Sequence, residues 1–224
     1  MAGRTVIIGD VHGCIAELEQ LLGKLRVDEQ DDLLFLGDLV NKGPDSAAVV
    51  RLARERRARC VRGNHEVRLL RYRRTGAASA LKGKDLATVK QLTAADWAYL
   101  ETMPLLIELP EFSAVAVHGG FAPRAQHWRR QPEEIVTQVQ VIDSNGEPRK
   151  RSEAPRGRPW ADFWEGPEFV LYGHTPRREV YRRTGSIGLD TGCVYGGALT
   201  AFCFPHRTLH QVPAERVHEY SAEF

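Results

Sequence analysis

Residues 6–13 read VIIGDVHG, a short apolar run that ends in a turn where glycines flank Asp10 and His12. The pattern occurs twice more, since residues 33–44 read LLFLGDLVNKGP and residues 60–66 read CVRGNHE. Each stretch is followed by a segment with helical features, which predicts a strand, a turn and a helix. Strands that alternate with helices predict an α/β fold with a largely parallel sheet, whose ligands gather at the carboxyl ends of the strands. The three polar turns therefore belong at one edge of that sheet.

The helices of the first half can be placed from apolar spacing and capping residues. Apolar residues at helical spacing predict a first helix from Ile15 to Leu25. Asp45 or Ser46 can cap a second helix that continues to about residue 57. Residues 76–102 are expected to be mostly helical.

The second half is rich in short strand-like segments and predicts a second, more antiparallel sheet. These segments are residues 105–107, 114–117, 169–172, 180–181, 198–204 and 209–212. Residues 144–159 are polar and rich in Pro, Gly and Arg, which predicts a long loop, whereas residues 189–197 predict a strand and a glycine turn. The length of 224 residues fits one domain, residues 1–224, because single cores remain favourable up to roughly 250 residues.

Composition excludes several classes of protein. Hydrophobic residues make up 42% and charged residues 27%, which suggests neither a disordered chain nor a membrane protein. A net charge of +2 is too small for the whole-molecule field to indicate nucleic-acid binding. The strand at residues 5–8 leaves no room for a signal sequence, and the four scattered cysteines are interpreted as reduced thiols. We therefore expect a cytoplasmic protein that has no contact with a membrane.

Two later strands end in the same kind of turn, His118-Gly119-Gly120 and Gly173-His174, so five glycine-flanked turns carry Asp, Asn or His. Carboxylate, amide oxygen and imidazole are mixed oxygen and nitrogen donors that suit Mn²⁺, Fe²⁺ or Zn²⁺. Flanking glycines permit the tight turns that aim such side chains. Each of the five turns therefore supplies candidate metal ligands. One such turn would be ordinary, but five in order predict a metal centre.

These turns also carry a resemblance to a known family. Residues 9–13, 37–43 and 63–66 match the patterns G-D-x-H-G, G-D-x-V-x-x-G and G-N-H-E. With the two histidine turns, the chain resembles the calcineurin-like metallophosphoesterases, and within them the phosphoprotein phosphatase group. The resemblance implies a four-layer α/β/β/α sandwich of two mixed sheets. It also implies a hydrolase with two divalent ions, with Mn²⁺ expected and Fe²⁺ or Zn²⁺ as alternatives.

The resemblance further implies a role for each ligand. Carried over by position, the ligands of one ion are Asp10, His12 and Asp38, and those of the other are Asp38, Asn64, His118 and His174. Two ions about 3.5–4 Å apart can hold a bridging hydroxide and a phosphoryl oxygen for in-line displacement. His65, which is adjacent to a ligand, would protonate the leaving oxygen as a general acid.

The chain departs from typical protein phosphatases at Asn41 and Lys42, which stand where that group has Asp and Arg. A neutral Asn41 can only hydrogen-bond His65, whereas an aspartate would favour its protonated form, so His65 should be a less persistent acid. An alkoxide leaving phosphoserine needs that proton more than a phosphate or nucleotide, which already leaves as a stable anion. Lys42 presents a point charge in place of a bidentate guanidinium. The departure therefore favours phosphoanhydride substrates.

The variant turn, with residues 189–197, LDTGCVYGG, resembles the ApaH-like phosphatases, relatives of symmetrical diadenosine tetraphosphatase. That resemblance implies a phosphorylated small-molecule or polyphosphate substrate, such as diadenosine tetraphosphate, or a nucleotide-capped RNA end. A serine/threonine phosphoprotein phosphatase with the same two ions is the alternative. An inactive polyanion-binding module is disfavoured because every ligand position and His65 are present. A second phosphate-binding cation is expected among the arginines of the 144–159 loop, and the preferred residue is Arg158.

Other conspicuous side chains are interpreted as structural. The aromatic residues could stack a nucleobase, but packing in a small core is favoured for Trp128, Trp160, Phe163 and Trp164. No role is predicted for the histidines outside the motifs, which are His127, His206, His210 and His218.

Overall fold

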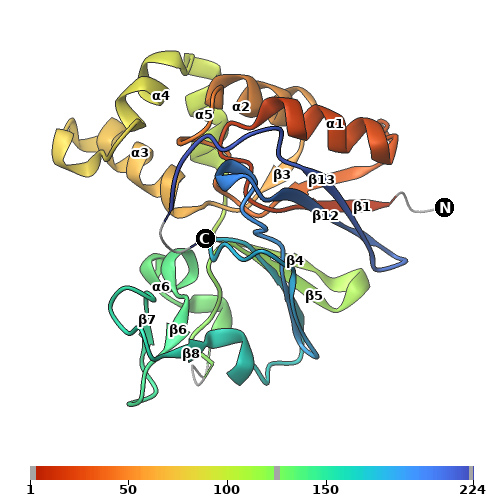
Figure 1. Ribbon diagram of the computed structural model, residues 1–224, viewed down its shortest axis with the longest axis vertical. Coiled ribbons are helices and arrows are strands. Elements are labelled where there is room, and N and C mark those ends of the chain that lie inside the picture. Colours follow the sequence, from red (N-terminus) through yellow and green to blue (C-terminus); the bar gives the residue numbers. More distant parts are fainter. Residues whose placement is uncertain (1–3, 124–126, 222–223) are drawn as a thin grey trace.

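Two five-stranded β-sheets face each other in the computed structural model, which describes residues 4–123, 127–221 and 224 (Figure 1). The strands of the first sheet are β1 (Thr5–Ile8), β2 (Asp32–Phe35), β3 (Arg59–Cys60), β12 (Ala198–Phe204) and β13 (Thr208–Pro213). They are arranged in the order β13-β12-β1-β2-β3, and β1, β2 and β3 run parallel as predicted. β12 pairs antiparallel with β1, with Phe204 opposite Thr5. The prediction that β12 and β13 lie in the second sheet is wrong, because they extend the free edge of β1.

Helices cover the outer face of the first sheet (Figure 1). They are α1 (Ile15–Leu25), α2 (Ser46–Glu55), α3 (Asn64–Thr75), α4 (Asp85–Gln91) and α5 (Ala94–Thr102). Asp45 caps α2 as predicted, since its carboxylate accepts a hydrogen bond from the Ala48 N–H at 2.8 Å. α3 begins earlier than predicted, at Asn64, so that Asn64 and His65 lie in its first turn rather than before it.

The second sheet is mixed. Its strands are β4 (Leu106–Leu109), β5 (Ala114–Val117), β9 (Phe169–Tyr172), β10 (Tyr181–Arg183) and β11 (Ser186–Gly188). In the order β10-β11-β9-β5-β4, the two inner pairs are parallel and the two outer pairs are antiparallel. The sheet is therefore less antiparallel than predicted, because β9 reaches β11 and β5 through crossover connections.

Two segments predicted from turn residues differ from the structure. Residues 144–159 contain the short strands β7 (Pro148–Arg149) and β8 (Arg158–Pro159), which pair with β6 (Val141–Ile142) in a three-stranded sheet. Residues 189–197 form no strand but contain the 3₁₀ helix η5 (Cys193–Tyr195), which lies between two left-handed glycines. The remaining 3₁₀ helices are η1 (Ala78–Ala80), η2 (Pro110–Phe112), η3 (Trp128–Arg130) and η4 (Trp160–Phe163).

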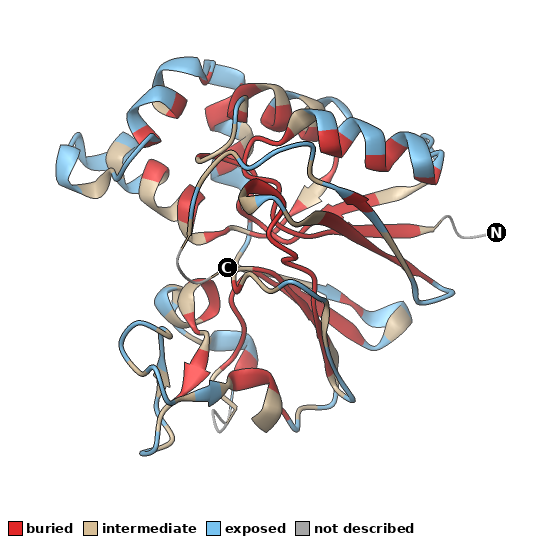
Figure 2. Cartoon of the chain, viewed as in Figure 1, coloured by how far each residue is buried: buried red, intermediate tan, exposed pale blue. Residues whose placement is uncertain are grey.

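Alternation along β1 shows how the layers are held together. Val6 and Ile8 belong to the core between the first sheet and its helices, whereas Ile7 belongs to the core between the two sheets. This is the period of two expected for a strand that is buried on both faces. In Figure 2 the central strands of both sheets are mostly coloured as buried. The four-layer arrangement of two mixed sheets implied by the resemblance is thus confirmed.

The outer face of the second sheet is covered by α6 (Glu133–Gln138), η3, η4 and the three-stranded sheet (Figure 1). The core between the second sheet and these elements is aromatic. The ring centroid of Phe121 lies 5.3 Å from that of Trp128 and 5.1 Å from that of Trp164. Trp160 contacts Tyr172 of β9 at 4.8 Å. The predicted packing of the tryptophans is confirmed. In the described part of the chain, no helix is long and apolar enough to cross a membrane.

Candidate metal centre

The candidate ligands come from the carboxyl ends of β1, β2, β5 and β9 and from the first turn of α3. The backbone there is unusual, because the φ angles of His12, Asp38 and His174 are +48°, +49° and +65°. Glycine is required nearby: a Cβ on Gly63 would lie 2.2 Å from an Asp38 carboxylate oxygen, and one on Gly173 would lie 2.0 Å from Asp10. The tight turns predicted from the sequence therefore bring these side chains together.

Asp38 lies at the middle of the centre. His12 Nε2 is 3.5 Å from Asp38 Oδ2, and His118 Nε2 is 3.4 Å from Asp38 Oδ1. The two oxygens of one carboxylate thus face histidines from two different turns. This geometry suits a ligand shared between two cations, the role that the family resemblance implies for Asp38.

The second half of the centre gathers around Asn64. Its side-chain oxygen lies 3.0 Å from His118 Nε2 and 2.9 Å from His174 Nδ1. One ligand atom of His118, one of His174 and one of Asp38 lie within 4.8 Å of one another. An amide oxygen, a carboxylate and two imidazoles therefore converge as a mixed donor set suited to a divalent transition metal.

Each candidate histidine ligand has one ring nitrogen against a backbone carbonyl. His12 Nδ1 lies 2.9 Å from Val40 O, His118 Nδ1 lies 2.7 Å from Leu36 O, and His174 Nε2 lies 3.2 Å from Gln138 O. A carbonyl only accepts, so these nitrogens carry a proton, and in the neutral form of each ring the other nitrogen has a lone pair that faces the centre. Such outer hydrogen bonds are typical of metal-binding histidines. The residues present therefore fit a pair of divalent cations.

Asp10 connects two of the turns. Both of its carboxylate oxygens lie 3.1 Å from the backbone N–H of His174, which joins the end of β1 to the end of β9. Burial raises the pKa of Asp10 well above its usual range, and the nearby Asp190 carboxylate raises it further. Burial likewise raises the pKa of Asp190 to about 6. Crowded carboxylates of this kind are stabilised by bound cations.

The buried histidines titrate in opposite directions. Burial lowers the pKa of His12 and of His174 to about 3, which keeps both rings neutral and able to bind metal. Burial also opposes protonation of His118, but the adjacent Asp38 and Asp10 outweigh it and raise its pKa to about 10. Without cations, His118 therefore carries the positive charge that balances Asp38. A metal ion at this position would replace that proton.

His65 is held by two hydrogen-bond donors at the same nitrogen. Asn41 Nδ2 and Arg68 Nη2 each lie 3.1 Å from His65 Nδ1. A guanidinium can only donate, so Nδ1 must be the unprotonated acceptor, and the proton of the neutral ring lies on Nε2. Nε2 is 4.0 Å from Asp38 Oδ2 and so faces the centre. Burial lowers the pKa of His65 well below its usual range, and the cationic Lys42 and Arg68 add to this although Asp38 opposes it.

Lys42 reaches the centre from the other side. Its Nζ is 3.0 Å from His12 Nε2 and donates a hydrogen bond to the Tyr195 hydroxyl at 2.7 Å. The φ angle of Lys42 is +65°, in the left-handed region, and the residue is half-buried. A cation beside a ligand histidine is suitably placed to bind a phosphoryl oxygen, as predicted for Lys42.

Comparisons with known proteins agree with this geometry. The family model described as calcineurin-like phosphoesterase matches residues 3–210. The chain belongs to the calcineurin-like phosphoesterase family. The asymmetrical bis(5'-nucleosyl)-tetraphosphatases PrpE of Halalkalibacterium halodurans and Bacillus subtilis are 35% and 32% identical to it, with 94% and 96% of each chain covered. This phosphoesterase is thus a metal-dependent hydrolase.

Solved structures show the same fold. The crystal structure of a candidate diadenosine tetraphosphatase has a TM-score of 0.85 at 36% identity and covers 96% of this phosphoesterase and 95% of its own chain. A serine/threonine phosphatase from Saccharomyces cerevisiae has a TM-score of 0.62 at 16% identity, with 99% of this chain and 82% of its own covered. At that identity the likeness concerns the fold alone.

The sequence analysis predicted no role for several residues that support the phosphoesterase site. Glu66 is fully buried, and its carboxylate accepts hydrogen bonds from the backbone N–H groups of Asp38, Leu39 and Gly63 at 2.9, 2.9 and 3.0 Å. It thereby ties α3 to the turn after β2. Glu66 is the last residue of the G-N-H-E motif, so its position in that motif could have indicated a role in the site.

Arg68 was also missed. It lies one helical turn after His65 and forms two hydrogen bonds to Asp85 of α4, at 3.0 and 3.1 Å. The i, i+3 spacing on α3 places Arg68 and His65 on one face and was a usable signal. Asp85 has no such signal, because α4 is brought to α3 only by tertiary packing.

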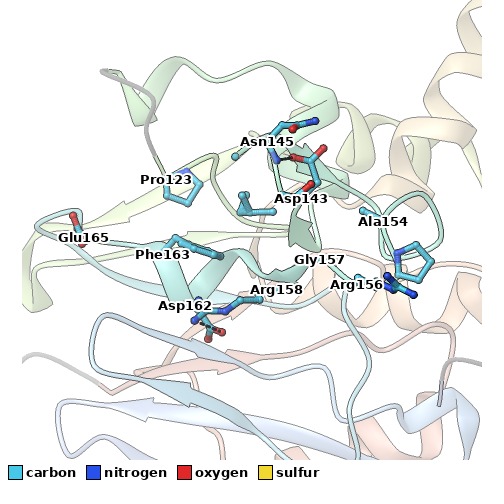
Figure 3. Close-up of a pocket in the computed structure, with 14 residues that line it drawn as sticks. Pro123, Asp143, Asn145, Ala154, Arg156, Gly157, Arg158, Asp162, Phe163 and Glu165 are labelled. Carbon is cyan, nitrogen blue, oxygen red and sulfur yellow. Dashed lines mark hydrogen bonds and ion pairs between the residues drawn. The ribbon is translucent and has the colours of Figure 1, made fainter.

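Arg158 lies apart from the contacts that join the ligands. Its guanidinium packs on the Phe163 ring at 4.8 Å and lies 3.6 Å from Asp162. It lines a depression of about 1060 Å³ between β8 and the turn around Asn145 (Figure 3). None of the candidate metal ligands lines this depression. The phosphate-binding role of Arg158 remains a prediction.

Proposed function

We propose that this phosphoesterase hydrolyses phosphoanhydride bonds in dinucleoside polyphosphates, with diadenosine tetraphosphate as the reference substrate. The observation that carries the proposal is the pair of donors, Asn41 and Arg68, at His65 Nδ1. They favour a neutral imidazole with its proton on Nε2. Such a ring donates a hydrogen bond but gives up a proton poorly, which suits a leaving group that is already a stable anion.

The proposal assigns a role to each group in the centre. The residues that would hold two divalent cations, with Mn²⁺ preferred, are Asp10, His12, Asp38, Asn64, His118 and His174. Such a pair, when bound, lowers the pKa of water and polarises a phosphoryl oxygen. Lys42 binds a non-bridging phosphate oxygen and neutralises its charge. His65 donates a hydrogen bond from Nε2 to the departing oxygen, and Asn41 orients the ring.

We further propose that cleavage is asymmetrical, so that diadenosine tetraphosphate and water give ATP and AMP. This proposal is supported by the two PrpE relatives, which are named as asymmetrical tetraphosphatases and are covered over 94% and 96% of their length. The match to residues 3–210 supports a single catalytic domain. A cytoplasmic location is supported by four buried cysteines that are all free, as a reducing compartment favours.

A protein-phosphatase activity is the second proposal, supported by the same centre with His65 beside Asp38. A panel of substrates separates the two proposals. Hydrolysis of diadenosine tetraphosphate, inorganic polyphosphate, nucleotide-capped RNA and a phosphoserine peptide is measured with Mn²⁺, Fe²⁺, Zn²⁺ or Mg²⁺. We expect the highest kcat/KM for an anhydride substrate with Mn²⁺, and ATP and AMP in equal amounts. Faster hydrolysis of the phosphopeptide would reverse the order of the two proposals, and protein that neither binds nor needs a metal would indicate a binding module.

A further inference from the structure

A pocket of about 380 Å³ with a cationic lining includes residues that closely follow His174 in the chain. Three of its residues are arginines: Arg151 follows β7, and Arg177 and Arg178 lie after the turn that carries His174. The rest of the lining consists of Val141, Pro155, Gly157, Pro159, Pro176 and Phe224.

Contacts connect the wall of this pocket to the centre from the side of β9. Pro176, which lines the pocket, is two residues from His174, and the N–H of Arg177 donates to the carbonyl of Asp190 at 3.1 Å. His174 Nε2 contacts the Gln138 carbonyl at the end of α6, from which the chain continues into Val141 of the pocket wall.

A second connection comes from the side of Lys42. The Lys42 ammonium donates to the Tyr195 hydroxyl at 2.7 Å, and the Tyr195 ring lies 5.6 Å from the Phe224 ring. Phe224 lines the pocket. A substrate that extends from Lys42 along Tyr195 would therefore enter the pocket.

Within the described residues, the three arginines of the pocket have no carboxylate partner to neutralise their charge. Among residues 4–123, 127–221 and 224, no carboxylate forms an ion pair with Arg151, Arg177 or Arg178. The carboxylate of Asp162, in contrast, is already engaged by Arg183 at 2.6 Å and by the Tyr181 hydroxyl at 2.7 Å.

Arg177 shows the cost of this arrangement. It is half-buried against the Tyr181 ring, at 3.9 Å, and its Nε is buried without a hydrogen-bond partner. Burial and the positive charge of Arg151 both lower its pKa. A half-buried cation beside a like charge is unfavourable unless an anion binds between them.

We propose that Arg151, Arg177 and Arg178 form a second phosphate-binding site, which holds the phosphates of a polyphosphate substrate beyond the bond that is hydrolysed. The inference rests on the proposed anhydride substrate and names where the rest of that substrate binds. Guanidinium groups suit this role because they bind phosphate oxygens through paired hydrogen bonds. The site selects long substrates without taking part in bond cleavage.

The test compares substrates with and without distal phosphates. Arg177→Ala and Arg178→Ala are assayed with diadenosine tetraphosphate and with p-nitrophenyl phosphate, which has a single phosphate. Each variant should raise KM for the tetraphosphate by on the order of tenfold with little change in kcat, and should leave p-nitrophenyl phosphate hydrolysis within about twofold. Arg71→Ala, which removes an exposed arginine on α3, is the matched control and should change neither. Since Arg178 is exposed, its variant keeps the test valid if Arg177→Ala fails to fold.

Inorganic tripolyphosphate separates failure of this inference from failure of the proposed function. It should inhibit p-nitrophenyl phosphate hydrolysis, and both variants should weaken that inhibition about tenfold. If the wild-type protein does not cleave the tetraphosphate but the variants still weaken inhibition, the proposed substrate is wrong and the second site stands. Equal losses on both substrates, or unchanged tripolyphosphate inhibition, would overturn the second site.

Discussion

Replacing Asn41 with aspartate tests the leaving-group argument directly. Asn41 lies at a left-handed position, with φ of +69°, which aspartate tolerates about as well as asparagine. Its Nδ2 is 3.1 Å from His65 Nδ1. The variant exchanges a neutral donor for a carboxylate of nearly the same shape, so the protonated form of His65 gains a partner that it lacks in the natural protein.

The magnitude follows from the contacts at His65 Nδ1. A carboxylate at hydrogen-bond distance raises the pKa of a histidine by about 1 to 3 units. Arg68 lies 3.1 Å from the same nitrogen, so it also attracts the new carboxylate and opposes protonation of His65. We therefore expect the pKa of His65 to rise by an amount near the low end of this range. One unit corresponds to about 1.4 kcal/mol and raises the protonated fraction about tenfold where the ring is mainly neutral. Hydrolysis of a phosphoserine peptide should therefore rise about tenfold.

The assay measures kcat/KM for that peptide and for diadenosine tetraphosphate under identical conditions. We expect the anhydride to change by less than about twofold, because its leaving group needs little proton transfer. Gln30→Glu introduces the same charge change at an exposed residue and serves as the control. An N41D enzyme that gains nothing on the phosphoserine peptide, or that gains equally on both substrates, would refute the reasoning.

Four further results are expected. His65→Ala should retain two metal ions per chain by elemental analysis while turnover falls at least about a hundredfold, and loss of metal would mean that His65 is a ligand. Glu66→Gln should lower the free energy of unfolding by about 3 kcal/mol in a denaturant titration. The reason is that a glutamine amide cannot accept hydrogen bonds from all the backbone N–H groups that the buried carboxylate binds. A change below about 1 kcal/mol would contradict this. Without metal, the pKa of His118 in the folded protein is raised to about 10, above its unfolded value of about 6.5. The protonated His118 should therefore stabilise the metal-free protein fully below about pH 6.5, and this stabilisation should be lost as the pH rises towards 10. Metal binding at pH 8 should release about one proton from His118, and calorimetry in buffers of different ionisation enthalpy that shows no release would exclude this.

The sequence was sufficient to predict the candidate ligands that the structure brings together, but not the residues that surround them. Asp10, Asp38 and Asn64 could be predicted because each lies within a few residues of its own strand end, and local turn chemistry places it there. Asp85 and Tyr195 could not, because each reaches the site through the packing of distant elements.

The sheets illustrate the same limit. β1, β2 and β3 follow one another with single helices between them, so their parallel order is a local consequence of βα units. β12 is strand-like in sequence, but only the unpaired edge of β1, some 190 residues earlier, decides which sheet it joins. Periodicity identifies a strand and its buried faces without naming its partner.

The pairing of β1 with β12 has a consequence for synthesis of the chain. On the ribosome, β1 can pair with β2 as soon as both have emerged, but its other edge has no partner until Ala198–Phe204 is made. An unpaired edge is a template for association with other chains. The nascent protein therefore carries this edge through most of its translation, and a chain that stops before Ala198 should aggregate rather than yield a smaller folded enzyme.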